Sequence, residues 1–362
     1  MSTANIKRFG GAIEAALSSV VETAGNTISA DDAGTREAFL NAWIRTLVDY
    51  ARFIRSSSNT LKAPVIVAYV PDVGQFAHGI GWERRAMLRA SHISNFAGML
   101  AAGTGEIAGY VCPRELKPGD TKNIEREIRN VGLELALTIG LMSEEKLIVW
   151  PDGIEGSTAP IERNLDNDCS VVINRTKIDG ELTLFYEVHA RQTMKWWKNA
   201  ALRVTVETPE GAVQEDLRLF LLARNSDIAL IRAEESIGNG RADITIAPIP
   251  KRATGESAVL ELKTIRDVRT PKTIEKTPTK ISEKDNINWA SSGISQTAAY
   301  RDQNKLDAAF LCVYDFCSKS NTTNVDKEVM PAAEQYNVLY RRYWITATHK
   351  EHRKERYPLK PS

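Results

Sequence analysis

The sequence predicts an α/β fold in two domains. After residue 60, short apolar runs rich in β-branched residues alternate with segments of helical periodicity, a pattern typical of layered α/β proteins. The chain has 362 residues, and a domain usually holds roughly 100–200. Residues 151–168 are rich in Pro, Gly, Asp and Asn and lack apolar periodicity, which favours a linker or long turn. We therefore expect an N-terminal α/β domain over 1–165 and a second domain over 166–362.

The composition is that of an ordinary globular protein. Apolar residues make up 43% of the chain and charged residues 26%, with 47 basic against 46 acidic side chains. This excludes a disordered or fibrous chain and a basic field over the whole molecule. It leaves room for a nucleic-acid partner, since a basic segment can be balanced by acids elsewhere.

Cysteine content and hydropathy predict a cytoplasmic protein. Four scattered cysteines in 362 residues are too few for a disulfide scaffold, so a reducing compartment is the simpler interpretation. No apolar run approaches the roughly 18 residues that span a bilayer. We therefore expect no membrane partner.

The elements of the first half follow from their periodicity. The first 60 residues have helical spacing, with Asp31 and Asp32 as N-cap candidates before the apolar pattern of 38–55. The alternation then predicts strands at 63–71, 106–112 and 146–150, and helices around 82–100 and 124–141.

The second half begins with three predicted strands. Two runs, 169–176 and 181–190, are joined by Lys-Ile-Asp-Gly at 177–180, and Asp-Gly favours a tight hairpin. A third run covers 202–208. We expect a helix over 213–224, because Val213, Leu217, Phe220 and Leu221 form one apolar stripe.

A meander and a crossover follow. Strands are expected at 227–236, 241–248 and 257–264, with Gly238-Asn239-Gly240 as the first turn. A helix at 288–304 and a strand at 307–315 complete the predicted order of helix, three strands, helix and strand.

Two carboxylates on neighbouring predicted strands suggest metal chemistry. Asp243 lies on one strand, and Glu261 and Lys263, two residues apart, project from one face of the next. Asp243, Glu261 and the backbone carbonyl after Glu261 are hard oxygen ligands suited to Mg²⁺, with Mn²⁺ as an alternative. Such an ion promotes phosphodiester hydrolysis, and Lys263 would act as base or charge stabiliser. Taken separately, the same residues would be a solvated strand face with a surface salt bridge.

This ordered set resembles the PD-(D/E)XK nuclease superfamily, the fold of many restriction endonucleases and RecB-like nucleases. The motif stands here as GNGRAD at 238–243 and LELK at 260–263, with Ala242 where the family often has Pro. The resemblance covers about 110 residues from 213 to 317. It implies a restriction-endonuclease-like core, an αβββαβ order with a mixed central sheet flanked by helices. It also implies metal binding by Asp243 and Glu261 and a catalytic role for Lys263.

Two further sites are implied by the resemblance. In the family an acid on the first helix often completes the site, and Glu215 or Asp216 matches that position; the alternative is a helix-terminal charge that favours the macrodipole. Gln296 and Tyr300 resemble the RecB-type QxxxY element, which helps hold the lysine or the substrate. As i and i+4 residues they are also compatible with an ordinary amphipathic pair.

Basic residues concentrate on both sides of these motifs. Segment 263–285 has seven basic and four acidic residues, and segment 341–362 has seven basic and two acidic residues, which gives +3 and +5. Such charge supplies phosphate affinity without reading sequence. We expect the two segments to border a nucleic-acid groove.

The sequence therefore predicts a Mg²⁺-dependent nuclease with DNA as the expected substrate. By analogy with the family, restriction or anti-phage defence is the expected setting, and the protein is expected as a homodimer or as the partner subunit of a defence system. The N-terminal domain would serve as a sensor, specificity or oligomerisation module. Two alternatives stay open: a non-catalytic nucleic-acid-binding or regulatory protein that retains the fold, and a nuclease switched on by a small nucleotide bound to the N-terminal domain.

Overall fold

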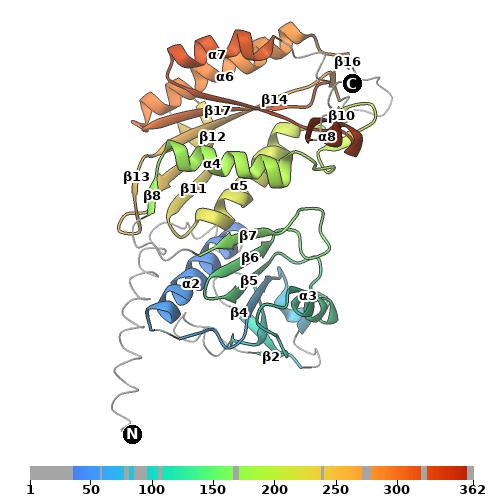
Figure 1. Cartoon of the computed structure of the whole chain (residues 1–362), viewed down its shortest axis with the longest axis vertical. Helices are drawn as coiled ribbons and strands as arrows, with labels where there is room; N and C mark the ends of the chain where they lie inside the picture. The colour runs from blue at the N-terminus through green and yellow to red at the C-terminus, as the bar shows by residue number, and fades with distance from the viewer. Residues whose placement is uncertain are drawn as a thin grey trace, which may run out of the picture. The chain divides into compact units, whose positions relative to one another are not determined.

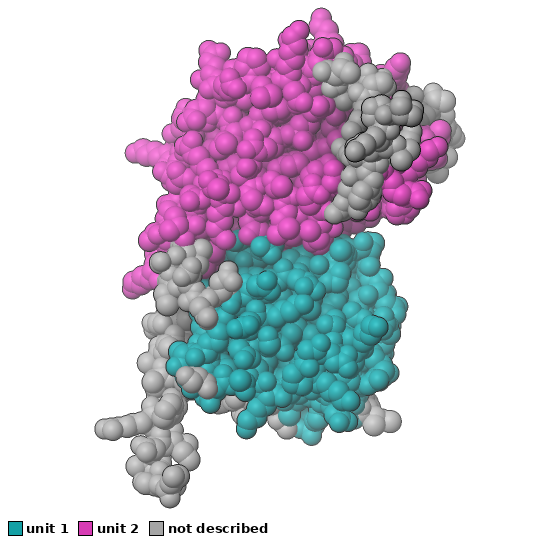
Figure 2. All heavy atoms as spheres, viewed as in Figure 1, with its two compact units in different colours: residues 1–169, 222–227 teal, residues 170–221, 228–362 magenta. Residues whose placement is uncertain are grey.

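The computed structural model describes residues 36–57, 59–76, 81–84, 96–104, 108–165, 171–237, 240–270, 279–318 and 324–356. The chain is a mixed α/β protein that divides into two compact units (Figure 2). Unit 1 comprises residues 1–169 and 222–227, and unit 2 comprises 170–221 and 228–362. The break after residue 169 lies four residues beyond the predicted boundary at 165.

Unit 1 is built on one mixed sheet. In its described residues, seven strands follow the order β2-β4-β3-β1-β5-β6-β7, in which β1 and β3 are parallel and the other neighbours antiparallel. The strands are β1 (Val65–Tyr69), β2 (Glu83–Arg84), β3 (Met99–Gly103), β4 (Ala108–Pro113), β5 (Thr138–Ser143), β6 (Lys146–Trp150) and β7 (Ile161–Asn164).

Two helices and a short 3₁₀ turn accompany this sheet. Helix α2 (Arg36–Ser56) buries Phe39, Trp43 and Leu47, which recur every four residues and so share one face. Helix α3 (Thr121–Asn130) starts at Asp120, whose side chain accepts a hydrogen bond from the Asn123 backbone N–H. The 3₁₀ turn covers Val73–Phe76.

Several predictions for unit 1 are confirmed, and two are wrong in extent. The strands expected at 63–71, 106–112 and 146–150 are β1, β4 and β6. The helix expected over 124–141 ends at Asn130, because Gly132 takes a left-handed conformation (φ 71°) and the apolar run after it forms β5. The end of the helix expected over 82–100 is strand β3, while 85–95 and the first 35 residues lie outside the described residues.

The linker expected over 151–168 is only partly a linker. Residues 151–160 form turns, but β7 pairs antiparallel with β6 and belongs to the sheet of unit 1. The turn residues at 151–160 were predicted correctly. The short edge strand β7, which follows them, was not predicted.

Unit 2 has a five-stranded central sheet in the part of the chain that the structure describes. The order is β11-β12-β14-β17-β18, with the first three strands antiparallel and the last three parallel. The strands are β11 (Ala229–Ile237), β12 (Gly240–Pro248), β14 (Ala258–Ile265), β17 (Ala308–Asp315) and β18 (Leu339–Trp344).

Helices cover both faces of this sheet (Figure 1). On one face lie α6 (Glu283–Gln303) and α7 (Val325–Gln335), which share an apolar cluster with β14 and β17. The other face carries α4 (Arg175–Phe185), which continues as a π-helical turn over Tyr186–Ala190, and α5 (Pro209–Asn225). Phe185 of α4 meets both Phe220 of α5 and Tyr314 of β17 edge-on or tilted. The predicted succession of helix, three strands, helix and strand is present as α5, β11, β12, β14, α6 and β17.

The hairpin predicted over 169–190 is wrong. Among the described residues 171–190, only β8 (Val171–Ile173) is a strand, and residues of the expected turn lie inside α4. Asn174 caps that helix by accepting from the Lys177 N–H, and Ile178, Leu182 and Phe185 are buried at helical spacing. Burial of this stripe outweighs the turn preference of Asp179-Gly180.

Short elements complete unit 2. They are β9 (Trp197–Asn199), β10 (Val204–Thr205), β13 (Ala253–Gly255), β15 (Val268–Arg269), β16 (Thr279–Lys280) and α8 (His349–Arg356). Within the described residues, Cys112, Cys312 and Cys317 are buried free thiols, as a chain without a disulfide scaffold predicts. No helix in those residues is both long and apolar enough to cross a membrane.

Candidate active site

The candidate site lies where two strands of the unit 2 sheet separate. The pairing of β12 with β14 ends at Ile244 and Leu260, and the next residues along the strands are Asp243 and Glu261. Asp243 Oδ2 accepts a hydrogen bond of 2.6 Å from the Leu262 backbone N–H. At this point a side-chain carboxylate therefore replaces the backbone hydrogen bonds that join β12 and β14 further along. The Asp243 carbonyl accepts another, of 2.9 Å, from Gln214 Nε2 on α5. The structure thus brings the two predicted carboxylates together at the divergence.

Glu261 and Lys263 form a buried ion pair. Lys263 Nζ lies 2.6 Å from Glu261 Oε1, and the two residues are 4% and 1% exposed. The second carboxylate oxygen, Glu261 Oε2, is buried without a hydrogen-bond partner. Charges this deeply buried are costly and contribute little net stability even when paired. Titratable groups buried in this way are more typical of sites of chemistry than of groups that stabilise a fold.

A third carboxylate, Glu210, reaches the same cluster from α5. Its Oε2 accepts a hydrogen bond of 3.2 Å from the Thr264 backbone N–H, just beyond Lys263. The Thr208 carbonyl accepts the first helical bond of α5, from Ala212, so Pro209 and Glu210 occupy the first two helical positions. Sequence reasoning missed Glu210 because it started this helix at 213. The sequence Thr-Pro-Glu at 208–210 is a typical helix start and could have indicated the earlier beginning.

Helix α6 closes the cluster on the other side. The Lys263 ammonium lies 5.0 Å from the centre of the Trp289 ring, a cation–π distance, and Trp289 also hydrogen-bonds Glu210. One turn further on, Gly293 leaves space for the lysine chain. A Cβ there would lie 3.2 Å from Lys263 Cγ and 2.6 Å from Leu311 Cδ1.

Burial and mutual repulsion shift the titration of these groups. Burial, and then the charge of Asp243, raises the pKa of Glu261 to about 7 against the opposing effect of Lys263. Burial likewise raises the pKa of Glu210. Burial lowers the pKa of Lys263, but Glu261, Glu210 and Asp243 outweigh it and the net direction is upward, so the ammonium keeps its proton at neutral pH.

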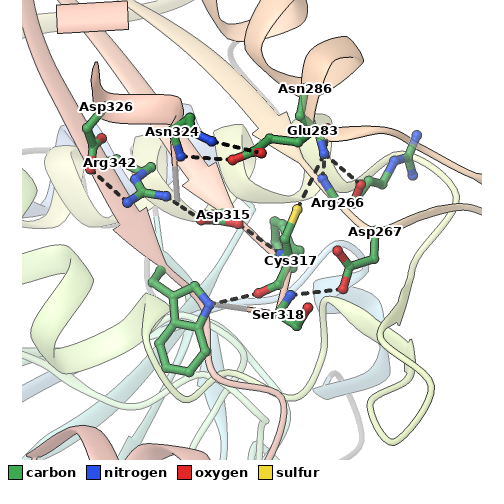
Figure 3. A network of polar contacts seen from close by, with 12 residues as sticks. Arg266, Asp267, Glu283, Asn286, Asp315, Cys317, Ser318, Asn324, Asp326 and Arg342 are labelled. Carbon is green, nitrogen blue, oxygen red and sulfur yellow. Dashed lines mark hydrogen bonds and ion pairs between the residues drawn. The ribbon is translucent and has the colours of Figure 1, made fainter. Parts of the chain in front are cut away.

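A guanidinium lies beside this cluster. The Arg266 backbone N–H donates to Asn286 Oδ1, and the Arg266 carbonyl accepts from Asn286 Nδ2, so one buried side chain holds both backbone groups (Figure 3). Its side chain donates to Thr205 Oγ1 at 3.2 Å. Burial, and then the charge of Arg269, lowers the pKa of Arg266, while Glu210 acts in the other direction. Burial and the nearby positive charge of Arg269 both favour an anion beside the Arg266 guanidinium.

A wider polar network anchors this end of the sheet. Asp315 is fully buried, accepts from the Cys317 N–H and pairs with Arg342, which also pairs with Asp326 (Figure 3). Cys317 Sγ in turn accepts from Asn286 Nδ2. The network links the end of β17 to α6 and so fixes the segment that carries Arg266.

Two of the predicted helix acids stay outside the cluster. Glu215 is exposed, and five residues after Glu210 it points about 140° away around α5. Asp216 accepts from Lys195 Nζ and Trp196 Nε1 instead. The acid of α5 that lies beside Lys263 is Glu210, which begins the same helix, and a role of Glu215 in the site stays a prediction.

The predicted QxxxY pair forms an internal contact. Gln296 Nε2 donates to the Tyr300 hydroxyl over 2.9 Å along α6, and Tyr300 belongs to the buried apolar cluster of that face. A role of the pair in holding the lysine or the substrate stays a prediction.

The predicted basic tail is partly neutralised. Arg341 and Arg342 belong to β18 rather than to a tail; Arg341 forms a bidentate pair with Asp179, and Arg342 pairs with Asp315 and Asp326. Residues 357–362 lie outside the described residues, as does 271–278 of the other basic segment. In the segment 263–285 the described basic residues are Lys263, Arg266, Arg269, Lys280 and Lys284.

The cluster has part of the donor set for a hard cation. In the described residues, no group of three or more His, Cys, Asp or Glu side chains is arranged to hold a metal ion. Asp243 and Glu261 nevertheless fit Mg²⁺, which is usually bound through one or two carboxylates. Glu261 Oε2, buried without a partner, is the oxygen that such an ion would satisfy.

Comparison with known proteins adds no relative. A scan against protein-family models, a search of curated proteins and a search of solved structures found no significant match.

Proposed function

We propose that unit 2 is a metal-dependent nuclease that hydrolyses phosphodiester bonds in DNA. The observation that carries the proposal is the buried Glu261–Lys263 pair beside Asp243, at the point where β12 and β14 separate. Perturbed, buried titratable groups that gather in this way are typical of active sites. The αβββαβ order of unit 2, and the resemblance of its motifs to PD-(D/E)XK nucleases, support the same class.

Asp243 and Glu261 would hold the metal ion, Mg²⁺ or Mn²⁺. When bound, the ion would polarise the phosphoryl group and stabilise the developing negative charge. Glu261 must give up its proton to bind, and its pKa of about 7 allows this near neutral pH.

The other side chains suit the remaining roles. Lys263 keeps its proton, so we assign it to stabilising charge on the phosphoryl oxygens rather than to acting as base. Glu210, with its raised pKa and its contact at Thr264, is our candidate to accept a proton from the attacking water. Arg266 would bind a phosphate next to the reacting one.

Cleavage assays with matched variants test the proposal. We expect wild-type protein to cleave plasmid, linear or single-stranded DNA in Mg²⁺ or Mn²⁺ and not in EDTA. Asp243→Asn and Lys263→Met should each reduce the rate at least a hundredfold, on the order of what one electrostatic group contributes. Glu210→Gln should reduce it by a similar factor, and Glu215→Gln should leave it unchanged.

The pair Glu210→Gln and Glu215→Gln serves as its own control, because both change one carboxylate on the same helix. Equal activity of wild type, Asp243→Asn and Lys263→Met would contradict the catalytic assignment. Cleavage of RNA and not DNA would contradict the substrate. No cleavage of any nucleic acid would favour a non-catalytic binding protein. A role in restriction or anti-phage defence stays a prediction.

A further inference from the structure

Trp289 differs from the other tryptophans of the chain in its exposure to solvent. The seven tryptophans all lie in described residues, and six are buried or half-buried. Trp289 is 48% exposed, and it is the one that touches the candidate active site. Exposing half of an indole forgoes a large apolar burial. Its position beside Lys263 and Glu210 links that exposure to the site.

The indole is held in one orientation. Lys263 lies over the ring at 5.0 Å, and Glu210 receives the hydrogen bond of Trp289. Helix α6 is itself anchored by a capping box, in which Ser282 and Asp285 each bond the backbone of the other. A ring fixed in this way loses little entropy when a flat partner stacks on its open surface.

The charges around the ring match a nucleic-acid strand. Arg266 offers a positive charge beside the cluster, where a phosphate would lie. Aromatic rings that alternate with such charge bind the bases of unpaired strands, since every base has a flat face. A base within a duplex is already stacked and does not offer that face.

We propose that Trp289 is a stacking platform for an unpaired base of the DNA strand that enters the active site. This inference rests on the proposed nuclease function and narrows its substrate to single-stranded or locally unpaired DNA. Trp289 thereby positions the strand, with Arg266 on a phosphate and the indole on a base.

Binding without turnover tests the platform. Affinities of oligo(dT), of an abasic oligomer of equal length and of a blunt hairpin duplex are measured in Ca²⁺ by fluorescence anisotropy. Wild-type protein should bind oligo(dT) tighter than the abasic strand by on the order of tenfold to a hundredfold. Trp289→Ala should bind both equally, Trp289→Phe should keep part of the preference, and the duplex should be insensitive to either change.

Two control variants separate base contacts from other effects. Arg266→Ala should weaken binding of oligo(dT) and of the abasic strand by the same factor, because a phosphate contact does not depend on the base. Tyr336→Ala, which alters an equally exposed aromatic at the end of α7, should change nothing. An oligo(rU) strand distinguishes DNA from RNA; tighter binding of oligo(rU) than of oligo(dT) would overturn the assignment to DNA.

The outcomes also separate this inference from the proposed function. A base preference retained in Trp289→Ala, or no measurable binding of oligo(dT), would overturn the platform whatever the cleavage assay shows. A base preference that is lost in Trp289→Ala, in a protein that cleaves nothing in Mg²⁺ or Mn²⁺, would support the platform and contradict the nuclease.

Discussion

Lys263 holds together a group of charges that repel one another. Its ammonium pairs with Glu261 and lies over the Trp289 ring, and the charges of Glu210 and Asp243 also act on it. Three carboxylates near one cation leave an excess of negative charge, which is why Glu261 takes up a proton near neutrality. The site is therefore under electrostatic strain, which a further cation would relieve.

This strain predicts a pH-dependent stability. The folded state raises the pKa of Glu261 from 4.5 to about 7, so between these values the folded protein binds more protons than the unfolded chain. The stabilising contribution is complete below pH 4.5 and is lost as the pH rises through 7. Relative to Glu261→Gln, wild-type protein should lose up to about 3 kcal/mol of unfolding free energy between pH 5 and pH 8. Urea unfolding in EDTA measures both proteins.

Groups other than Glu261 titrate in both proteins, so their effects cancel in the difference of unfolding free energy between wild type and Glu261→Gln. A difference in unfolding free energy that stays constant from pH 5 to pH 8 would show that Glu261 titrates normally. A difference that changes in favour of wild type as the pH rises would reverse the assigned direction.

At the scale of residues, the sequence predicted the centre of the cluster better than its edge. Asp243, Glu261 and Lys263 were identifiable because strand alternation puts residues two apart on one face. Glu210 was not, since its place depends on how the first turn of α5 meets the end of β14. Trp289 was not either, because exposure is a property of packing and no spacing reveals it.

At the scale of elements, the predictions were right where one signal was present and wrong where two competed. The strands β11, β12 and β14 have alternating or continuous apolar patterns with clear turns, and the prediction found each within two residues. In α4, an Asp-Gly turn signal competed with an Ile178–Leu182–Phe185 stripe. A local turn preference is a small free energy, and burial of three large side chains is a larger one.

Helix α6 depends on a glycine where it crosses the site. At Gly293 a Cβ would meet Leu311 and the Lys263 chain, whereas at Gly180 in α4 nothing lies within 4 Å. Gly293→Ala should therefore lower the unfolding free energy by about 1–3 kcal/mol through overpacking. Gly180→Ala should raise it by roughly 0.5–1 kcal/mol through helix propensity. Urea denaturation measures the unfolding free energies of both variants. If both changes stabilise the protein, the space around Gly293 is large enough for a methyl group and the close approach to Lys263 is not limiting.

At the scale of the whole molecule, the near balance of 47 basic and 46 acidic residues conceals local arrangements. Arg341 and Arg342, counted as free charge in the sequence, neutralise Asp179, Asp315 and Asp326. Net charge could not reveal this, because pairing is set by the register of β17 and β18.

The division into units also depends on a pairing that is distant in sequence. Residues 222–227 belong to unit 1 although α5 begins in unit 2, so the chain passes from one unit to the other at 169, 221 and 227. Asp227 ends the segment, is fully buried and pairs with Arg52 at 3.0 Å and Arg163 at 2.7 Å. Desolvation tends to raise the pKa of Asp227, but Arg163 and Arg52 outweigh it and lower the value.

Removing this charge should weaken unit 1. Asp227→Asn leaves Arg163, whose side chain is 12% exposed, without its counter-charge, and breaking such a pair costs about 3–5 kcal/mol. Because the pKa of Asp227 is lowered on folding, wild type should keep its advantage above pH 3.8 and lose it as the pH falls further. Urea unfolding at pH 7 and pH 3, with hydrogen exchange in α2 and β7, measures the loss. Asp302→Asn, at an exposed carboxylate, should leave unfolding unchanged; equal behaviour of the two variants at pH 7 would mean that the Asp227 pairs do not hold unit 1 together.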